Sequence, residues 1–200
     1  MHIVFIHGHR ATARSFSFVA SKLPEYRHIF LEYDSERGFF ANHRRLLAEL
    51  EGVDDIFFVA HSLGGLHALH LAQELGERVR GAVTISTPYG GSEAAALLSY
   101  MMPFNPVYQD IRPTGAPVML SRQFDVPCAW TNIVSMKGHT PLMAAANDGV
   151  VTIESMRSRN DIRLVEIDTN HFEVLLSDAA VDIIRAAIRE VEPSALRVGD

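Results

Sequence analysis

Short apolar runs alternate with amphipathic segments along most of this chain. Continuous apolar runs bounded by turn residues predict six buried strands, at His2–Ile6, Arg27–Glu32, Ile56–Ala60, Val79–Ile85, Pro127–Ser135 and Ile162–Ile167. Apolar residues at helical spacing predict helices between them, at Arg14–Leu23, Phe39–Leu50, Leu63–Leu75 and Asp178–Glu190. Strands that are apolar throughout and alternate with helices indicate a parallel sheet covered on both faces.

Residues 87–126 depart from this alternation. Two short helices are expected there, near Glu93–Met101 and Pro117–Gln123. The apolar side chains at 97–104 are too many for a plain loop, so they either pack as an outer helix of the core or line a substrate cleft. The first reading is favoured because apolar stripes are usually core. From about Val191 the chain is expected to be a frayed tail.

The most informative motif is Ala60-His61-Ser62-Leu63-Gly64-Gly65, which lies between a predicted strand and a predicted helix. A serine on a tight turn between a strand and a helix is typical of the nucleophile elbow of serine hydrolases, whose usual pattern is G-x-S-x-G. Here Ala60 takes the place of the first glycine. The competing interpretation is that Ser62 only caps the helix, which is a common role for serine.

A serine nucleophile needs a base, and an acid that orients the base. The expected chain order is Ser, acid, His. His171 follows the last predicted strand by four residues and is the predicted base, whereas His139 comes before the best acid. Asp148, in an Asn-Asp-Gly turn after the fifth predicted strand, is the predicted acid, and Asp168 is the alternative.

Two backbone N–H groups are predicted to hold the oxyanion. One belongs to Leu63, directly after the nucleophile, and the other to His9, in the loop after the first strand. The competing interpretation of His7 and His9 is metal binding together with His67 and His70. No carboxylate or cysteine accompanies them at ligand spacing, so no metal and no cofactor is predicted.

Composition narrows the class of protein. The 200 residues suit a single domain (1–200), and a net charge of −6 without a basic cluster beyond Arg44-Arg45 argues against a nucleic-acid partner. The one cysteine, Cys128, excludes an internal disulfide and is consistent with a reducing compartment. No secretion leader and no membrane span is visible, so a cytoplasmic location is expected.

Together these motifs resemble the α/β-hydrolase family, in particular its small lipase-like and esterase-like members. The motif at 60–65 is similar to the elbow of small Bacillus-type lipases, in which alanine also replaces the first glycine. His7-Gly8-His9 resembles the oxyanion loop of lipases, and residues 84–92 and 147–151 are similar to segments of bacterial lipases. The segment at 84–92 also resembles one in membrane-associated lipid-remodelling proteins.

The resemblance implies a minimal α/β-hydrolase fold: six mostly parallel strands in the order 2-1-3-4-5-6, helices on both faces and no cap domain. It also implies a serine esterase with a Ser62-Asp148-His171 triad and a small-molecule or lipid-like ester as substrate. Phe16, Met101, Met102 and Phe104 are candidate substrate contacts. An acyltransferase or thioesterase with the same triad, a membrane-associated remodelling factor and a non-catalytic binding module on the same fold remain alternatives. Neither the natural substrate nor the oligomeric state can be read from the sequence.

Overall fold

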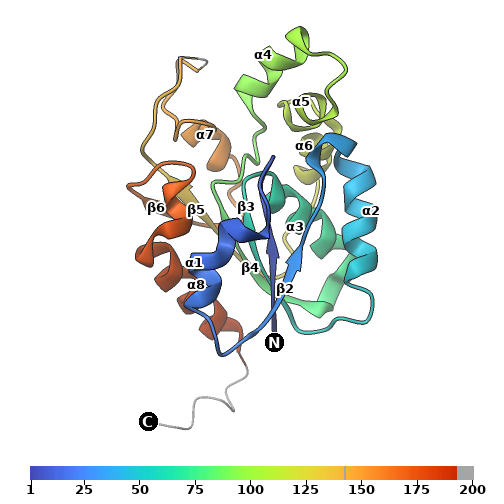
Figure 1. The fold of residues 1–200 in the computed structure, drawn as a ribbon, viewed down its shortest axis with the longest axis vertical. Coiled ribbons are helices and arrows are strands. Elements are labelled where there is room, and N and C mark those ends of the chain that lie inside the picture. Colours follow the sequence, from blue (N-terminus) through green and yellow to red (C-terminus); the bar gives the residue numbers. More distant parts are fainter. Residues whose placement is uncertain (142, 193–200) are drawn as a thin grey trace.

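A computed structural model describes residues 1–141 and 143–192 of the chain. Six strands form one sheet in the order β2-β1-β3-β4-β5-β6, and all neighbouring strands are parallel (Figure 1). The strands are β1 (His2–Ile6), β2 (Arg27–Leu31), β3 (Ile56–His61), β4 (Val79–Ile85), β5 (Ala129–Ser135) and β6 (Arg163–Ile167). The predicted strand order is therefore confirmed, and no additional cap domain is evident in the described part of the chain.

Helices cover both faces of this sheet. Four of them share buried apolar side chains with the strands: α1 (Ser17–Ser21), α2 (Phe39–Glu49), α3 (Leu63–Leu75) and α8 (Asp178–Val191). Because successive side chains of a strand point to opposite faces, β3 serves two cores. Phe57 and Val59 belong to the core with α1 and α8, whereas Phe58 and Ala60 belong to the core with α2 and α3. All four side chains are buried, which explains why the strand reads as continuously apolar.

The helix expected at Arg14–Leu23 is divided in the structure. A 3₁₀ turn at Ala13–Phe16 precedes α1, and Phe16 lies between them with φ −95° and ψ 5°, outside the helical region. The helix α1 stops at Ser21, three residues before Pro24, which disfavours helical geometry in the residue before it. A prediction of one continuous helix was wrong here.

Three helices, not two, fill residues 87–126: α4 (Glu93–Met101), α5 (Pro106–Ile111) and α6 (Ala116–Ser121). The unpredicted α5 begins at Asn105, whose side-chain oxygen accepts from the N–H groups of Val107 and Tyr108 at 3.0 and 3.4 Å. A second unpredicted helix, α7 (Ile153–Met156), is capped by the side chain of Thr152. Both helices are stabilised by a polar cap at the first turn.

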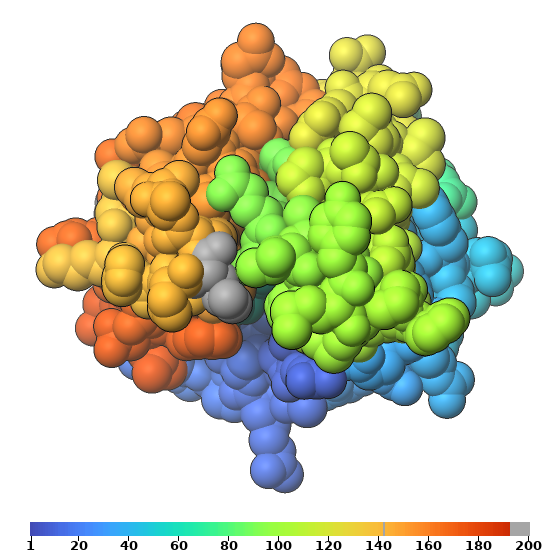
Figure 2. Space-filling view, turned by 90° about the horizontal axis from the view of Figure 1, so that it is seen from above, coloured from blue at the N-terminus to red at the C-terminus, as the bar shows by residue number. Residues whose placement is uncertain are grey.

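The apolar side chains of α4 do not form an outer part of the core, as the favoured reading expected. Only Ala95 and Ser99 of this helix are buried, while Leu97, Tyr100 and Met101 are 47%, 84% and 73% exposed. Phe104, after the helix, is 97% exposed. Seen from the carboxyl ends of the strands, α4 (green) lies near the middle of the molecular surface, between residues of the second half of the chain (orange) and the first (blue) (Figure 2).

Two further expectations concern the C-terminal tail and the absence of a membrane span. Val191 is the last residue of α8, and residues 193–200 of the predicted tail lie outside the described residues. Within residues 1–141 and 143–192, no helix has both the length and the apolar character that crossing a membrane requires.

Candidate active site

The turn that carries Ser62 has the strained geometry of a nucleophile elbow. Ser62 separates β3 from α3 and adopts φ 53° and ψ −121°, on the left-handed side that non-glycine residues rarely occupy. Its N–H donates to the carbonyl of Ile85 on β4 at 2.8 Å, which holds the strained residue in place. Its side chain makes no capping hydrogen bond to α3. The helix-cap interpretation of Ser62 therefore has no support in the geometry.

Two glycines let the elbow fit between the neighbouring strands. A Cβ on Gly64 would lie 2.2 Å from the carbonyl oxygen of Ile6, at the end of β1. A Cβ on Gly65 would lie 1.9 Å from Oγ1 of Thr87. No side chain fits in either place, so these glycines permit the close approach of α3 to the end of the sheet.

The loop after β1 lies directly against this turn. A Cβ on Gly8 would be 3.2 Å from Cβ of Ser62, so the backbone at Gly8 and His9 passes beside the serine. The imidazole of His9 is held elsewhere, with Nδ1 at 3.0 Å from Oγ of Ser35. Leu63 is the first residue of α3, and the first N–H groups of a helix have no carbonyl partner within it. Leu63 is therefore adjacent to Ser62 in the chain, and the loop that carries His9 contacts Ser62 at Gly8.

Asp148 and His171 form a buried pair beside the elbow. Nδ1 of His171 lies 2.7 Å from Oδ2 of Asp148, and both residues are almost fully buried. Since a carboxylate only accepts hydrogen bonds, we assign the ring proton to Nδ1, which leaves Nε2 with its lone pair. Asp148 lies in a short antiparallel turn closed by the bridge between Asn147 and Thr152.

Asp148 is held in its ionised form. Burial alone would raise the pKa of this carboxyl, but the hydrogen bond and the charge of His171 oppose it, as do donors from Ser135 and Val151. The net effect is a pKa below the ordinary value for aspartate. A carboxylate that stays charged is what the orienting acid of a triad requires.

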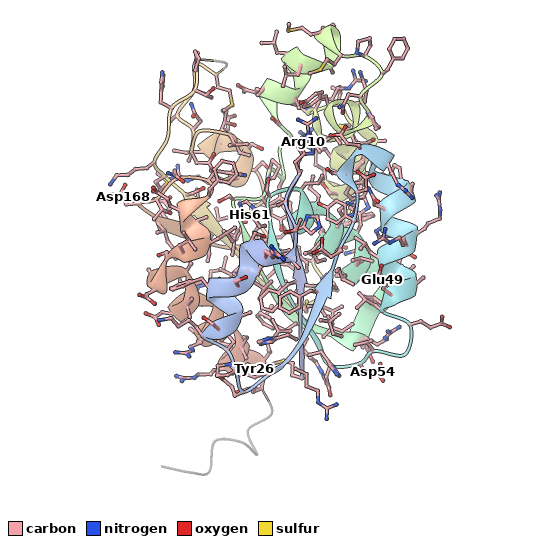
Figure 3. All side chains as sticks on the ribbon, in the orientation of Figure 1. Arg10, Tyr26, Glu49, Asp54, His61 and Asp168 are labelled. Carbon is pink, nitrogen blue, oxygen red and sulfur yellow. The ribbon has the colours of Figure 1, made fainter. Side chains whose placement is uncertain are left out.

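His61, which the sequence reasoning left without a role, fixes the backbone of His171. Its Nε2 donates to the carbonyl oxygen of His171 at 2.9 Å, and the N–H of His171 donates to the carbonyl of Asp148 at 3.1 Å. Burial, together with the charge of His171, lowers the pKa of His61 to about 3, so its ring is neutral at pH 7. Figure 3 shows His61 near the middle of the molecule, below Arg10. Both backbone polar groups of His171 are therefore occupied.

The residue before Ser62 lies against the predicted base, His171. The ring of His61, the neighbour of Ser62, lies 4.7 Å from the ring of His171, centroid to centroid. Within residues 1–141 and 143–192, no hydrogen bond joins Oγ of Ser62 to Nε2 of His171. Such contacts are often long in unliganded enzymes and shorten when substrate binds.

Comparison with known families decides the classification. The model of the alpha/beta hydrolase family matches residues 3–135, which is well over half of the chain. The chain belongs to the α/β-hydrolase family. The matched region contains the Ser62 turn and ends at Ser135, before Asp148 and His171. Membership supports hydrolase activity, and the assignment of the acid and the base depends on the geometry above.

Solved structures share the fold of this α/β hydrolase at low sequence identity. A lipase from Bacillus licheniformis in its mature form is 18% identical with a TM-score of 0.76, over 93% of this chain and 91% of that one. A lipase-esterase related protein from Clostridium acetobutylicum is 14% identical with a TM-score of 0.63, over 96% and 94%. A metagenomic carboxyl esterase is 14% identical with a TM-score of 0.70, over 96% and 74%. No curated protein matches the chain.

The predicted substrate contacts of this hydrolase differ in how far they are exposed. Phe16 has no exposed surface and packs on Phe5, with ring centroids 5.0 Å apart, so its predicted contact with substrate is corrected to a core role. Met101 and Met102 are 73% and 42% exposed and, with Phe104, remain available to a substrate. Burial raises the pKa of the Cys128 thiol to about 11, and a protonated thiol is a poor nucleophile.

The alternative acid, Asp168, and the histidines of the alternative metal site contact residues outside the Asp148–His171 pair. Asp168 is an exposed residue that forms an ion pair with Lys137 at 2.6 Å. His7 stacks on Tyr33 at 4.4 Å and His67 stacks on Phe39 at 4.0 Å, between ring centroids. Among the described residues, no group of three or more His, Cys, Asp or Glu side chains is placed to hold a metal ion.

Proposed function

We propose that this hydrolase cleaves carboxylic esters through an acyl-enzyme formed on Ser62. The observation that carries the proposal is the buried Asp148–His171 pair, 2.7 Å between Oδ2 and Nδ1, beside a serine on a left-handed turn. The first step follows from the proton positions. Nε2 of His171 accepts the hydroxyl proton as Oγ of Ser62 attacks the ester carbonyl, and Asp148 stabilises the charged imidazole.

The backbone around the serine supplies the remaining chemistry. The N–H groups of His9 and Leu63 stabilise the negative oxygen of the tetrahedral intermediate. His171 then gives its proton to the leaving alcohol, and the acyl group remains on Ser62. Water, deprotonated by the same histidine, attacks the acyl-enzyme and releases the carboxylic acid. These residues complete the reaction without a cofactor.

The experiment that tests the proposal is a set of initial rates on p-nitrophenyl esters of increasing acyl length. We expect turnover that depends on Ser62, with the best acyl length reporting the size of the acyl site. Added alcohols and thiols distinguish hydrolysis from acyl transfer, and thioester substrates test the thioesterase alternative. No turnover above that of Ser62→Ala on any of these would instead favour a non-catalytic binding module.

A second prediction concerns the oxyanion donor on the loop after β1. The substitution His9→Pro removes the backbone N–H at this position, because proline has none. We expect kcat to fall by about 10²–10³-fold, the usual cost of losing one oxyanion donor. Initial rates at saturating ester, with the urea unfolding midpoint as a check of the fold, measure the effect.

The matched control is His9→Ala, which deletes the imidazole and its bond to Ser35 but keeps the N–H. Its kcat should stay within about threefold of the wild type. If both variants lose activity equally, the imidazole and not the N–H is the important group. If neither loses activity, the second oxyanion donor lies elsewhere.

A further inference from the structure

A chain of two buried hydroxyl groups leads to the carboxylate oxygen of Asp148 that also bonds His171. Oγ of Ser135, at the end of β5, lies 2.5 Å from Oδ2 of Asp148. Oγ of Ser86, directly after β4, lies 2.7 Å from Oγ of Ser135. Neither serine has any exposed surface, so neither can contact a substrate.

The direction of these bonds follows from counting hydrogens. Asp148 is ionised and can only accept, so the single hydroxyl hydrogen of Ser135 points to Asp148. The bond between the two serines must then be donated by Ser86. The chain therefore runs from Ser86 to Ser135 to Asp148. Each hydroxyl that accepts a bond becomes a better donor for the next.

With this chain in place, the carboxylate of Asp148 accepts four hydrogen bonds. Oδ2 accepts from Ser135 and from Nδ1 of His171. Oδ1 accepts from the N–H groups of Val150 and Val151 at 3.0 and 2.8 Å. A carboxylate offers about four acceptor sites, so all are filled by the protein. The carboxylate can neither rotate nor take up a proton without breaking one of these bonds.

We propose that Ser135, supported by Ser86, is a positioning residue that fixes the Asp148 carboxylate so that it holds His171 with Nε2 directed to the nucleophile. This inference rests on the proposed function, since it assigns a role within the same triad. Ser135 acts only through Asp148 and is not itself a catalytic residue.

The strained backbone of Ser86 is consistent with a need for its hydroxyl group at this position. Ser86 adopts a φ of 52°, on the same left-handed side as Ser62, and its N–H donates to the carbonyl of Ile133 at 2.8 Å. A non-glycine residue in this conformation is strained. That conformation places the hydroxyl of Ser86 against Ser135, where glycine would be less strained but would supply no donor.

Few other ionisable groups lie around the carboxylate. His171 bonds to it directly, and His61 lies beside His171 with a neutral ring at pH 7. The thioether of Met156, which carries no charge, lies beside Ser135, with its sulfur 3.7 Å from Oγ of Ser135. The contact of Asp148 with β5 is therefore made by an uncharged hydroxyl group.

The test compares Ser135→Ala with the wild type by kinetics and by titration. We expect kcat to fall about tenfold, the lower end of the range for a hydrogen bond to a charged group, with KM unchanged because Ser135 contacts no substrate. Without substrate, NMR of the Asp148 carboxyl carbon should show its titration midpoint rising by about one pH unit, because one donor to the charged form is lost. Ser86→Ala should change both quantities in the same direction and by less.

Three further variants separate the hydrogen bond from packing. Ser135→Thr keeps the hydroxyl and should restore kcat and the titration, whereas Ser135→Cys keeps the size but donates weakly and should resemble Ser135→Ala. Ser121→Ala removes another buried hydroxyl, one that bonds the carbonyl of Val118 on α6, and should change neither quantity. The Thr and Cys variants also decide the matter if Ser135→Ala does not fold.

The outcomes for the two proposals are distinguishable. An unchanged Asp148 titration in Ser135→Ala and Ser135→Cys, or a loss of kcat that Ser135→Thr does not restore, would overturn the positioning role. If the wild type hydrolyses no ester through Ser62 but the titration shifts as expected, the hydroxyl chain stands and the proposed esterase function fails.

Discussion

Replacing Ser62 with alanine is expected to lower kcat on p-nitrophenyl esters by about 10⁴–10⁶-fold, because the substitution removes the atom that attacks the ester. The fold should be unaffected. The side chain of Ser62 makes no capping bond, and its backbone bonds to Ile85 and Gly65 do not depend on the hydroxyl. We therefore expect the free energy of unfolding in urea to change by less than about 1 kcal/mol.

The control for this prediction is Ser121→Ala, which changes a buried serine on α6 whose hydroxyl donates to the carbonyl of Val118. It should keep full activity. Labelling with a fluorophosphonate, which reacts with activated serines, should modify Ser62 in the wild type and nothing in Ser62→Ala. Substantial activity in Ser62→Ala would mean that the nucleophile is another residue.

The substitution Asp148→Asn is expected to lower kcat by about 10⁴-fold by forcing His171 into the wrong tautomer. Oδ1 of Asp148 faces the fixed N–H groups of Val150 and Val151, so the amide oxygen of an asparagine must take that place. The amide NH₂ then faces Nδ1 of His171, which has to accept instead of donate. The ring proton moves to Nε2, and that nitrogen can no longer take the proton of Ser62.

The size of this effect depends on the carboxylate being fully bonded. Were one acceptor site open, the amide could rotate at small cost and present its oxygen as an acceptor to Nδ1–H of His171. Asp168→Asn is the matched control, because Asp168 is exposed and paired with Lys137. It should change kcat by less than about twofold. A loss only in Asp168→Asn would assign the acid to Asp168, and equal losses in the two variants would contradict a role that belongs to Asp148 alone.

The sheet and the pairing of Asp148 with His171 could be predicted from the sequence because both follow short-range rules. Apolar runs mark strands that are buried on both sides, and parallel strands place the residues that follow them at one edge. That is why Asp148 and His171, 23 residues apart, could be paired before their contact at 2.7 Å was known. The turn around Ser62 was predictable because the small residues beside it are those that a tight turn between a strand and a helix requires.

The helix α5 and the exposure of α4 could not be predicted, because the same residue type can favour different structures in different parts of a protein. Asn105 and Pro106 look like residues that interrupt a helix, yet they begin α5, where asparagine caps the first turn and proline needs no N–H partner. The apolar residues of α4 look like core, yet they face outward. Nothing local in the sequence distinguishes these cases.

The residues that support the triad were missed for a different reason. His61 meets the carbonyl of His171 across 110 positions of chain. Ser86 meets Ser135 because β4 and β5 pair Ile85 with Ile133, and that alignment is set by packing of the whole sheet. Spacing along the chain carries no information about such register. The contacts of Ser86, Ser135 and His61 could therefore not be predicted from the sequence.

The strand order has a consequence for an incomplete chain of this protein. The elbow and the oxyanion loop follow β3 and β1, whereas the acid and the base follow β5 and β6 at the far side of the sheet. In the proposed mechanism, a chain that ended before β5 would carry Ser62 and the loop after β1 but would lack Asp148 and His171. Without the histidine that takes its proton, Ser62 of such an incomplete chain is not expected to attack an ester.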